Sequence, residues 1–200
     1  MDLRKIPVSG IVLVAGNLLS IILAVVERVD LGAIVWAYWI ESVMVGFFTI
    51  LALFLIGVRS KEISGFLASA MSAGFFAFHY GMFHFVYLIF LSALPWFAVD
   101  PAWYLWIMLT AGIMFLSHSF SFAVNVLIPA KDGAEMSGLD KTMMAPYSRI
   151  VPLHMTIILS GFVVAFVPLG DLLLRTAILA LFMGLKTAAD LGAHIKQHEE

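Results

Sequence analysis

Three ionisable side chains recur at four-residue spacing near the end of the chain: Lys186, Asp190 and His194. Because a helix turns once in about 3.6 residues, this spacing predicts that all three lie along one helical face. The surrounding segment is apolar, and an ionised group in hydrocarbon costs several kcal/mol unless it is paired or ligated. The pattern therefore predicts a polar stripe facing the interior of a bundle, where a carboxylate and an imidazole can bind a metal ion or transfer protons.

Other apolar segments also carry polar groups that are expensive in lipid. These groups are Glu41, His79 with His84 nearby, His118 followed by Ser121 and Asn125 at helical spacing, and Arg149 with His154. Five segments each carry such a group. The cost of placing these groups in lipid falls when groups from different segments meet and pair. We therefore expect most of them to converge on one cavity.

Composition identifies the class of protein. Apolar residues make up 62% and charged residues 12% of the 200 residues, against about 45–50% and about 25% in soluble domains. Such a chain is an integral membrane protein, with residues 1–200 forming a single transmembrane domain. The net charge of −2 gives no nucleic-acid signal. Without cysteine, disulfides and thiolate sites are excluded, and any metal must be held by His, Asp or Glu.

Six apolar segments each meet the requirement of about 20 residues for a transmembrane helix. They cover residues 7–26, 31–58, 65–91, 101–128, 149–167 and 171–195. The first lacks a small-x-small cleavage site, so we interpret it as a retained anchor. The predicted fold is an all-α bundle of six transmembrane helices. In the long loop 129–148, the Ser137-x-x-Asp140 capping pattern predicts a short interfacial helix or lid, with an ordinary mobile loop as the alternative.

Basic residues divide unequally between the two predicted sides of the membrane. The N-terminus, the 59–64 and 129–149 loops and the C-terminus carry eight Lys or Arg residues, whereas the other side carries only Arg28 and Arg175. By the positive-inside rule, both termini are predicted to be cytoplasmic. Membrane lipids are the expected partners, and the small residues Gly65, Ser69 and Ala73 also suit a contact in a homo-oligomer.

Depth in the bilayer orders the candidate site residues. At about 1.5 Å per residue, three groups lie about 22–27 Å from the outer surface of a core about 30 Å thick. These three are His118, His154 and Asp190. His194 lies about one turn nearer the cytoplasm and Lys186 about one turn nearer the outside. Glu41 and His79 fall in the middle or the outer half, and His84 lies higher still, toward the headgroups or a packing gap.

Two imidazoles and a carboxylate from different helices have the composition of a catalytic metal site with open positions. Zinc is favoured, because it lowers the pKa of bound water to about 7, and ferrous iron also fits this ligand set. The predicted metal ligands are His118, His154, Asp190 and His194, and the predicted catalytic groups are Glu41, His79 and Lys186. The same residues also suit interhelical hydrogen bonds, a Lys186–Asp190 ion pair, a Glu41–His79 pair or a proton relay.

Three function classes follow. The first is a metal-dependent membrane hydrolase acting on a lipid or other amphiphilic substrate. The second is a transporter or a proton or metal-ion pathway, with a relay from Glu41 to His194. The sequence shows no inverted repeat and no paired broken helices, which counts against transport. The third is a b-type haem protein, which the differing histidine depths support little.

The chain contains a set of five short motifs. They are Tyr-Trp-x-Glu from Tyr38, His-Tyr-Gly from His79, Ser-His-x-x-Ser-Phe from Ser117, Pro-Tyr-x-Arg-Ile-x-x-Leu-His from Pro146, and Leu-Lys-Thr-x-x-Asp-Leu-x-x-His from Leu185. The set resembles a family of bacterial and archaeal membrane proteins described as a domain of unknown function. The resemblance covers residues 38–194 and implies that the polar residues of the motifs are shared. It also implies a multi-pass protein of a prokaryotic inner (plasma) membrane, and relatives carry a second histidine where this chain has Tyr87.

A looser resemblance links the chain to multi-span hydrolases of the alkaline ceramidase and adiponectin receptor type. Those proteins hold zinc with three histidines near one membrane face. Here the last helix offers Asp-x-x-x-His in place of His-x-x-x-His, and six spans are predicted in place of seven. This resemblance implies zinc chemistry by analogy alone.

Overall fold

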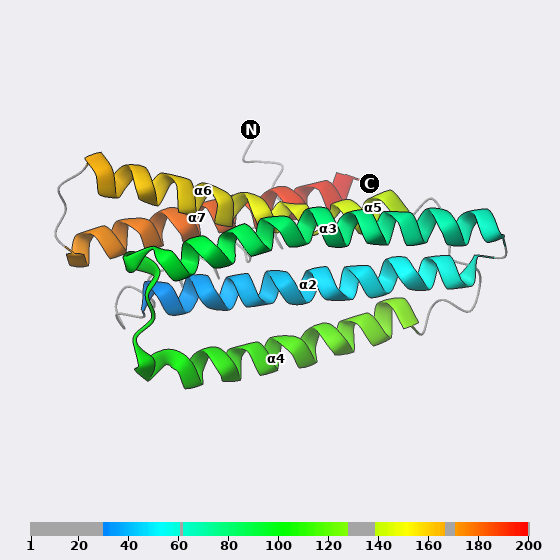
Figure 1. The fold of residues 1–200 in the computed structure, drawn as a ribbon, viewed down its shortest axis with the longest axis horizontal. Helices are drawn as coiled ribbons and strands as arrows, with labels where there is room; N and C mark the ends of the chain where they lie inside the picture. Colours follow the sequence, from blue (N-terminus) through cyan, green and yellow to red (C-terminus); the bar gives the residue numbers. More distant parts are fainter. Residues whose placement is uncertain (1–29, 61, 128–138, 167–170, 200) are drawn as a thin grey trace.

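Most of the chain that the structure describes is helical. The computed structural model describes residues 30–60, 62–127, 139–166 and 171–199, and no strand occurs in these ranges (Figure 1). The predicted all-α class is confirmed for them. The first predicted span, 7–26, lies outside the described residues.

Six α-helices are described, and three short helical turns join or extend them. The α-helices are α2 (Leu31–Arg59), α3 (Ile63–Ala93), α4 (Tyr104–Phe122), α5 (Leu139–Met144), α6 (Tyr147–Phe166) and α7 (Asp171–Glu199). The turns are η2 (Pro95–Phe97), η3 (Pro101–Trp103) and the π-helical η4 (Ala123–Leu127). Among the described residues, three helical stretches are long and apolar enough to cross a membrane: α2, α3 and Pro101–Phe122. Each predicted span that lies in the described ranges begins within two residues of the start of a helix or helical turn.

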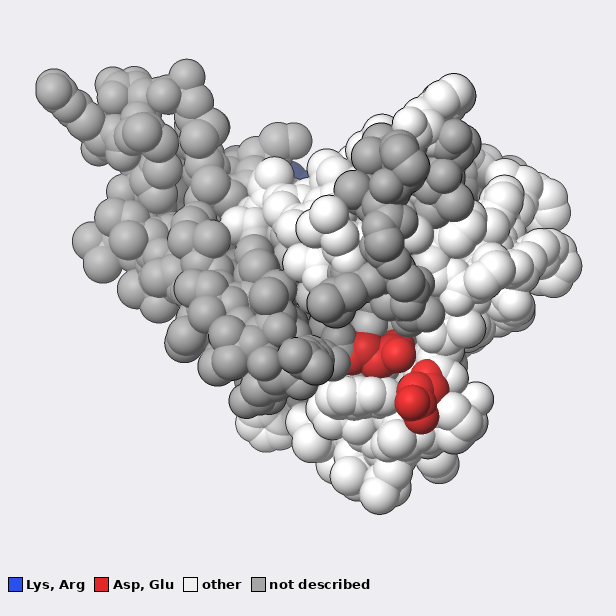
Figure 2. Space-filling model, turned by 90° about the vertical axis from the view of Figure 1, so that its left-hand side faces the viewer, with Lys and Arg blue, Asp and Glu red and all other residues white. Residues whose placement is uncertain are grey.

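Side-chain caps fix the helix ends at one end of the bundle. The Asp30 carboxylate accepts from the amide of Ala33 at 2.9 Å and starts α2, and the Asp100 carboxylate accepts from the amide of Ala102 at 2.9 Å and starts η3. Such caps satisfy amides that have no partner within the helix. Viewed from this end, the described surface shows acidic side chains and hardly any basic ones (Figure 2).

Small residues bring α2 and α3 close together. Gly65, Ser69 and Ala73 are all buried on α3, and the Ser69 hydroxyl donates to the carbonyl of Leu53 on α2. A Cβ added to Gly57 would lie 2.9 Å from the Ser69 Cβ. The small-residue stripe that suits an oligomer contact therefore packs α3 against α2 within the chain.

The remaining helices cover α2 and α3 unequally. The main described core contains aromatic and aliphatic side chains of α2, α3, α6 and α7, among them Tyr38, Phe76, Leu153 and Phe182. In contrast, α4 packs chiefly on α2, contributes no buried residue and lies on the far side of α2 from α6 and α7 (Figure 1). Apolar side chains on the open faces of α3 and α4 are widely exposed, as expected of a surface in contact with lipid.

The helical chain between residues 139 and 166 is broken at Ala145 and Pro146. The amide of Ala145 donates to the carbonyl of Lys141 and ends α5, and the amide of Arg149 donates to the carbonyl of Pro146 in the first turn of α6. Both helices pack against α2 and α3 and follow one another behind α3 (Figure 1). The predicted short helix in the 129–148 loop is thus present as α5, whereas residues 128–138 lie outside the described part.

Candidate functional site

The carboxylate of Glu41 on α2 is shared by side chains of two other helices. Nη1 of Arg149 on α6 lies 2.8 Å from Glu41 Oε1, and Nε2 of His118 on α4 lies 3.7 Å from the same oxygen. The side chains of Glu41, His118 and Arg149 are 18%, 27% and 31% exposed. At 3.7 Å the imidazole is beyond hydrogen-bonding distance, so His118 adds an ionic attraction only when it is protonated. Three helices therefore converge on one partly buried carboxylate.

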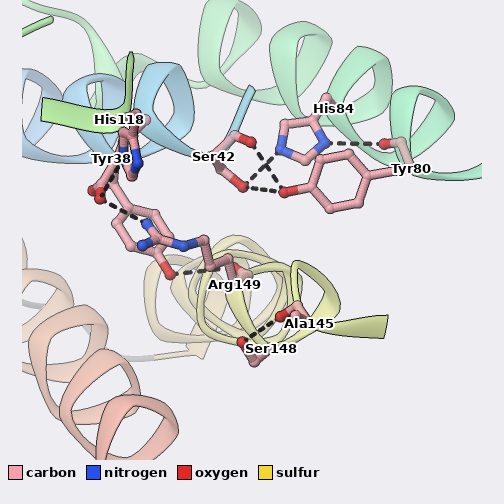
Figure 3. Close-up of polar contacts among 9 residues, drawn as sticks. Tyr38, Ser42, Tyr80, His84, His118, Ala145, Ser148 and Arg149 are labelled. Atoms are coloured by element: carbon pink, nitrogen blue, oxygen red, sulfur yellow. Dashed lines mark hydrogen bonds and ion pairs between the residues drawn. The ribbon is translucent and has the colours of Figure 1, made fainter. Parts of the chain in front are cut away.

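The break before α6 brings Arg149 to Glu41. The Tyr38 hydroxyl donates to the backbone carbonyl of Arg149 at 3.3 Å (Figure 3), and its ring packs edge-on against Phe182 of α7 at 5.1 Å. At about 1.5 Å per residue, Glu41 lies about 27 Å along α2 from Arg59. The start of α6 therefore lies well inside the bundle.

A second group of polar side chains lies beside Glu41, between α2 and α3. The hydroxyls of Ser42 and Tyr80 are 2.7 Å apart, and Nε2 of His84 lies 2.9 Å from the Ser42 hydroxyl (Figure 3). The other ring nitrogen, Nδ1 of His84, lies 2.9 Å from the backbone carbonyl of Tyr80. Since a carbonyl only accepts, Nδ1 carries a proton, and in the neutral ring Nε2 accepts from Ser42. The Tyr80 hydroxyl also donates to the backbone carbonyl of Ser42 at 3.1 Å. The three buried side chains thus form one hydrogen-bonded chain of Tyr80, Ser42 and His84.

A third contact joins α3 to the start of α6. Nδ1 of His79 lies 2.8 Å from the Tyr147 hydroxyl, and the His79 ring stacks on Phe75 at 5.3 Å. The Tyr147 ring also meets Tyr80 edge-on at 5.8 Å. Glu41 and His79, which the sequence allows to pair, therefore have separate partners.

The predicted metal ligands are only partly described. His118 lies with Glu41, whereas His154 lies against the rings of Phe83 and Tyr87, at 6.5 and 6.0 Å. Asp190 and His194 are on α7, but their side chains lie outside the described set. Among the side chains that are described, no group of three His, Asp or Glu residues is placed to hold a metal ion. The zinc or iron site therefore stays a prediction.

Glu41, His118 and His84 do not lie at the depths predicted for them. Glu41 and His118 are predicted at different levels, but Oε1 of Glu41 lies 3.7 Å from Nε2 of His118. His84, expected near the headgroups or a packing gap, is buried in the chain with Ser42. The predicted catalytic Lys186 is half-buried on α7.

Sequence reasoning missed Ser42 as a member of the site. A signal was present: Ser42, Gly46 and Thr49 repeat at helical spacing in an otherwise bulky apolar span, and all three are buried against neighbouring helices. A Cβ added to Gly46 would lie 2.7 Å from a ring carbon of Tyr80. Such small residues mark the face of a membrane helix where a neighbour comes close.

The described part of the chain is helical, with three helices apolar enough to cross a bilayer and a polar network between its helices, and these features identify a membrane protein. It belongs to a family of unknown function (DUF6498), which matches it over residues 2–200. The predicted resemblance to a family described as a domain of unknown function is thereby confirmed. No curated protein and no solved structure matches the chain, so the looser resemblance to ceramidase-type and adiponectin-receptor-type zinc hydrolases has no support.

Proposed function

We propose that the protein is a proton pathway through the plasma membrane of a prokaryote. In this proposal the chain is a multi-pass bundle of six transmembrane helices with both termini cytoplasmic. Glu41 is the group that binds and releases the proton, and His118 is its nearest exchange partner.

The observation that carries the proposal is the sharing of one carboxylate by Arg149 and His118. Arg149 keeps its charge at any physiological pH, so a fixed cation lies 2.8 Å from Glu41. A proton arriving on Glu41 removes the attraction to Arg149, whereas a proton on His118 adds an attraction to the same carboxylate. A carboxylate and an imidazole 3.7 Å apart, beside a fixed cation, are the elements of a proton relay within a membrane when a water or a small side-chain movement joins them.

The break between α5 and α6 supports a pathway over an enzyme. Irregular backbone at membrane depth is tolerated where it is buried in protein or lines a water-filled cavity, and discontinuous helices form the ion sites of many transporters. Here the break at Pro146 lies just before Tyr147 and Arg149, which contact His79 and Glu41. The sequence predicts a short helix in the 129–148 loop ahead of a separate span, and the break between these two helices favours the transport class.

The distribution of charge supports the proposed orientation. The end of the bundle that carries Asp30 and Asp100 shows hardly any basic side chains (Figure 2). The opposite end carries Arg59 in the last turn of α2, and its guanidinium donates to the carbonyl of Val126. Because basic residues favour the cytoplasmic side, the acidic end is the outer one in this proposal.

The predicted metal-dependent hydrolase remains open to a direct measurement. It requires a stoichiometric divalent ion in the purified protein, and loss of that ion in His154→Ala and Asp190→Ala. Elemental analysis of the three proteins measures both quantities. Retention of the ion in both variants contradicts the predicted ligands.

Proton flux into liposomes tests the proposed pathway. Purified protein is reconstituted around a pH-sensitive dye, and a potassium diffusion potential drives protons inward. We expect wild type to acidify the lumen faster than empty liposomes, and Glu41→Gln to fall to the empty-liposome rate. Glu62→Gln, which alters an exposed carboxylate before α3, is the control and keeps the wild-type rate. Equal flux in wild type and Glu41→Gln contradicts the proposal.

A further inference from the structure

The first turn of α6 lacks one of the hydrogen bonds that tie a turn to the rest of its helix. The helical chain is interrupted at Pro146, directly ahead of α6. Pro152 lies inside α6 and has no amide hydrogen, so it cannot donate to the carbonyl of Ser148 one turn earlier. A break on one side and a proline on the other therefore bound residues 147–151, the stretch that carries Arg149.

Two neighbouring side chains of α2 hold Arg149 from outside its own helix. The Tyr38 hydroxyl donates to the backbone carbonyl of Arg149 at 3.3 Å (Figure 3), and Oε1 of Glu41 lies 2.8 Å from Nη1 of Arg149. Because Tyr38 and Glu41 are three positions apart on α2, they lie on one face of that helix. Arg149 is thus held at its backbone by one residue and at its guanidinium by the other.

The ring of Tyr38 is held in place independently of Arg149. Tyr38 is 5% exposed, and its ring meets the ring of Phe182 on α7 edge-on, at 5.1 Å and 77°. Phe182 is itself 1% exposed. A buried aromatic ring that is packed between two helices has little freedom to turn. The Tyr38 hydroxyl therefore keeps its position when the attraction between Glu41 and Arg149 changes.

This independence gives the hydroxyl a role in the proposed pathway. Glu41 loses its charge each time it takes up a proton, and with the charge it loses the attraction to Arg149. The hydrogen bond from Tyr38 goes to a backbone carbonyl and does not depend on that charge. It therefore keeps residue 149 within reach while Glu41 is protonated, so that the cation is in place when the proton leaves.

We propose that Tyr38 is the positioning residue of the Glu41 site, and that its hydroxyl holds the start of α6 so that Arg149 faces Glu41 in both protonation states. Tyr38 carries no proton in this scheme and acts only through Arg149. The functional part of the inference rests on the proposed proton pathway. The placement of residue 149 is measured without any proton flux.

Cross-linking of the full-length protein in native membranes tests this placement. The pair Glu41→Cys with Arg149→Cys has no ion pair, so the Tyr38 hydroxyl is the contact from α2 that remains. Adding Tyr38→Phe removes that hydroxyl alone. We expect the initial rate of linking by a short bismaleimide to fall by up to about 12-fold, the equilibrium factor that one neutral hydrogen bond supplies. An unchanged rate overturns the proposal.

Two controls show whether the loss is specific to this contact. Tyr104→Phe alters an exposed tyrosine on α4 and should leave the rate of linking between positions 41 and 149 unchanged. The pair Phe54→Cys with Phe66→Cys joins α2 to α3 at exposed positions whose rings lie 6.4 Å apart. This second pair should link at the same rate with and without Tyr38→Phe. An equal loss at both pairs overturns the proposal, because the hydroxyl then stabilises the whole bundle.

A second readout separates positioning from simple stabilisation. We expect the coupling energy between Glu41 and Arg149, from a double-mutant cycle, to be lower in the Tyr38→Phe background than in the wild-type background. A hydroxyl that only stabilises the fold leaves this coupling unchanged, and that result overturns the proposal.

Proton flux into liposomes tests the functional part. Tyr38→Phe should acidify the lumen more slowly than wild type, and equal flux in the two overturns the role of Tyr38 in the pathway. If wild type is no faster than empty liposomes, the proposed pathway is contradicted instead. The linking rates and the coupling energy still decide whether Tyr38 positions Arg149.

Discussion

Breaking the Glu41–Arg149 ion pair from either side leaves an uncompensated charge inside the bundle. Glu41→Met strands the guanidinium of Arg149, and Arg149→Met strands the carboxylate of Glu41, which are 2.8 Å apart in the native protein. The double variant removes both charges and keeps an apolar pair of similar size. The hydrogen bond from Tyr38 survives in every variant, since it goes to the backbone carbonyl of residue 149.

The exposure of the pair sets the magnitude. Removing one partner of a fully buried pair costs about 3–5 kcal/mol, whereas an exposed pair contributes about 0–1 kcal/mol. With side chains 18% and 31% exposed, we expect each single substitution to lower the free energy of unfolding by about 2 kcal/mol. The double variant should lose much less than the sum, with a coupling energy of about 2 kcal/mol.

Unfolding in detergent micelles by added SDS, followed by far-UV circular dichroism, measures the four free energies of this cycle. A matched cycle pairs Glu62→Met with Arg149→Met. Glu62 lies beyond the far end of α2, so these two effects should add within about 0.5 kcal/mol. If the Glu41–Arg149 coupling is also below about 0.5 kcal/mol, the ion pair does not hold α6 to α2 and the reasoning fails.

Two further predictions concern the α2–α3 contact and use the same unfolding assay. Ser42→Ala should lower the free energy of unfolding by about 1–3 kcal/mol, because Nε2 of His84 then loses its buried partner. An unchanged free energy of unfolding contradicts the hydrogen bond between Ser42 and His84. Gly46→Ala should cost about 1–3 kcal/mol, since the new Cβ would lie 2.7 Å from the ring of Tyr80, which hydrogen bonds hold in place. Gly74→Ala is its control, because a Cβ there meets nothing within 4 Å and should leave stability unchanged or raised.

The helices could be predicted from the sequence because each coincides with a long, largely apolar segment, and in α2, α3 and Pro101–Phe122 this segment is long and apolar enough to cross a bilayer. Both α2 and α7 begin at the predicted residue, and α3 and α6 begin two residues earlier than expected. The polar residues of the site could also be named in advance, since a charged group such as Glu41 stands out in an apolar span. These features depend on composition along one segment.

Pairing between helices could not be predicted in the same way. An arginine at the end of an apolar segment predicts a position at the headgroups, and the sequence of that segment does not show that Arg149 pairs with Glu41 on another helix. Periodicity within α6 carries no information about Glu41, more than a hundred positions earlier in the chain. For the same reason, the hydrogen bond between Ser42 and His84 could not be predicted from the sequence.

The most direct test of the account is whether residue 149 lies beside residue 41 or near the end of the bundle that carries Arg59. The chain contains no cysteine, so Glu41→Cys with Arg149→Cys introduces the only two thiols. A short bismaleimide should link them in native membranes, as peptide mass spectrometry detects, and should fail to link Glu62→Cys with Arg149→Cys, because α2 alone separates these levels by about 27 Å. A link between residues 62 and 149, with none between 41 and 149, would contradict the account.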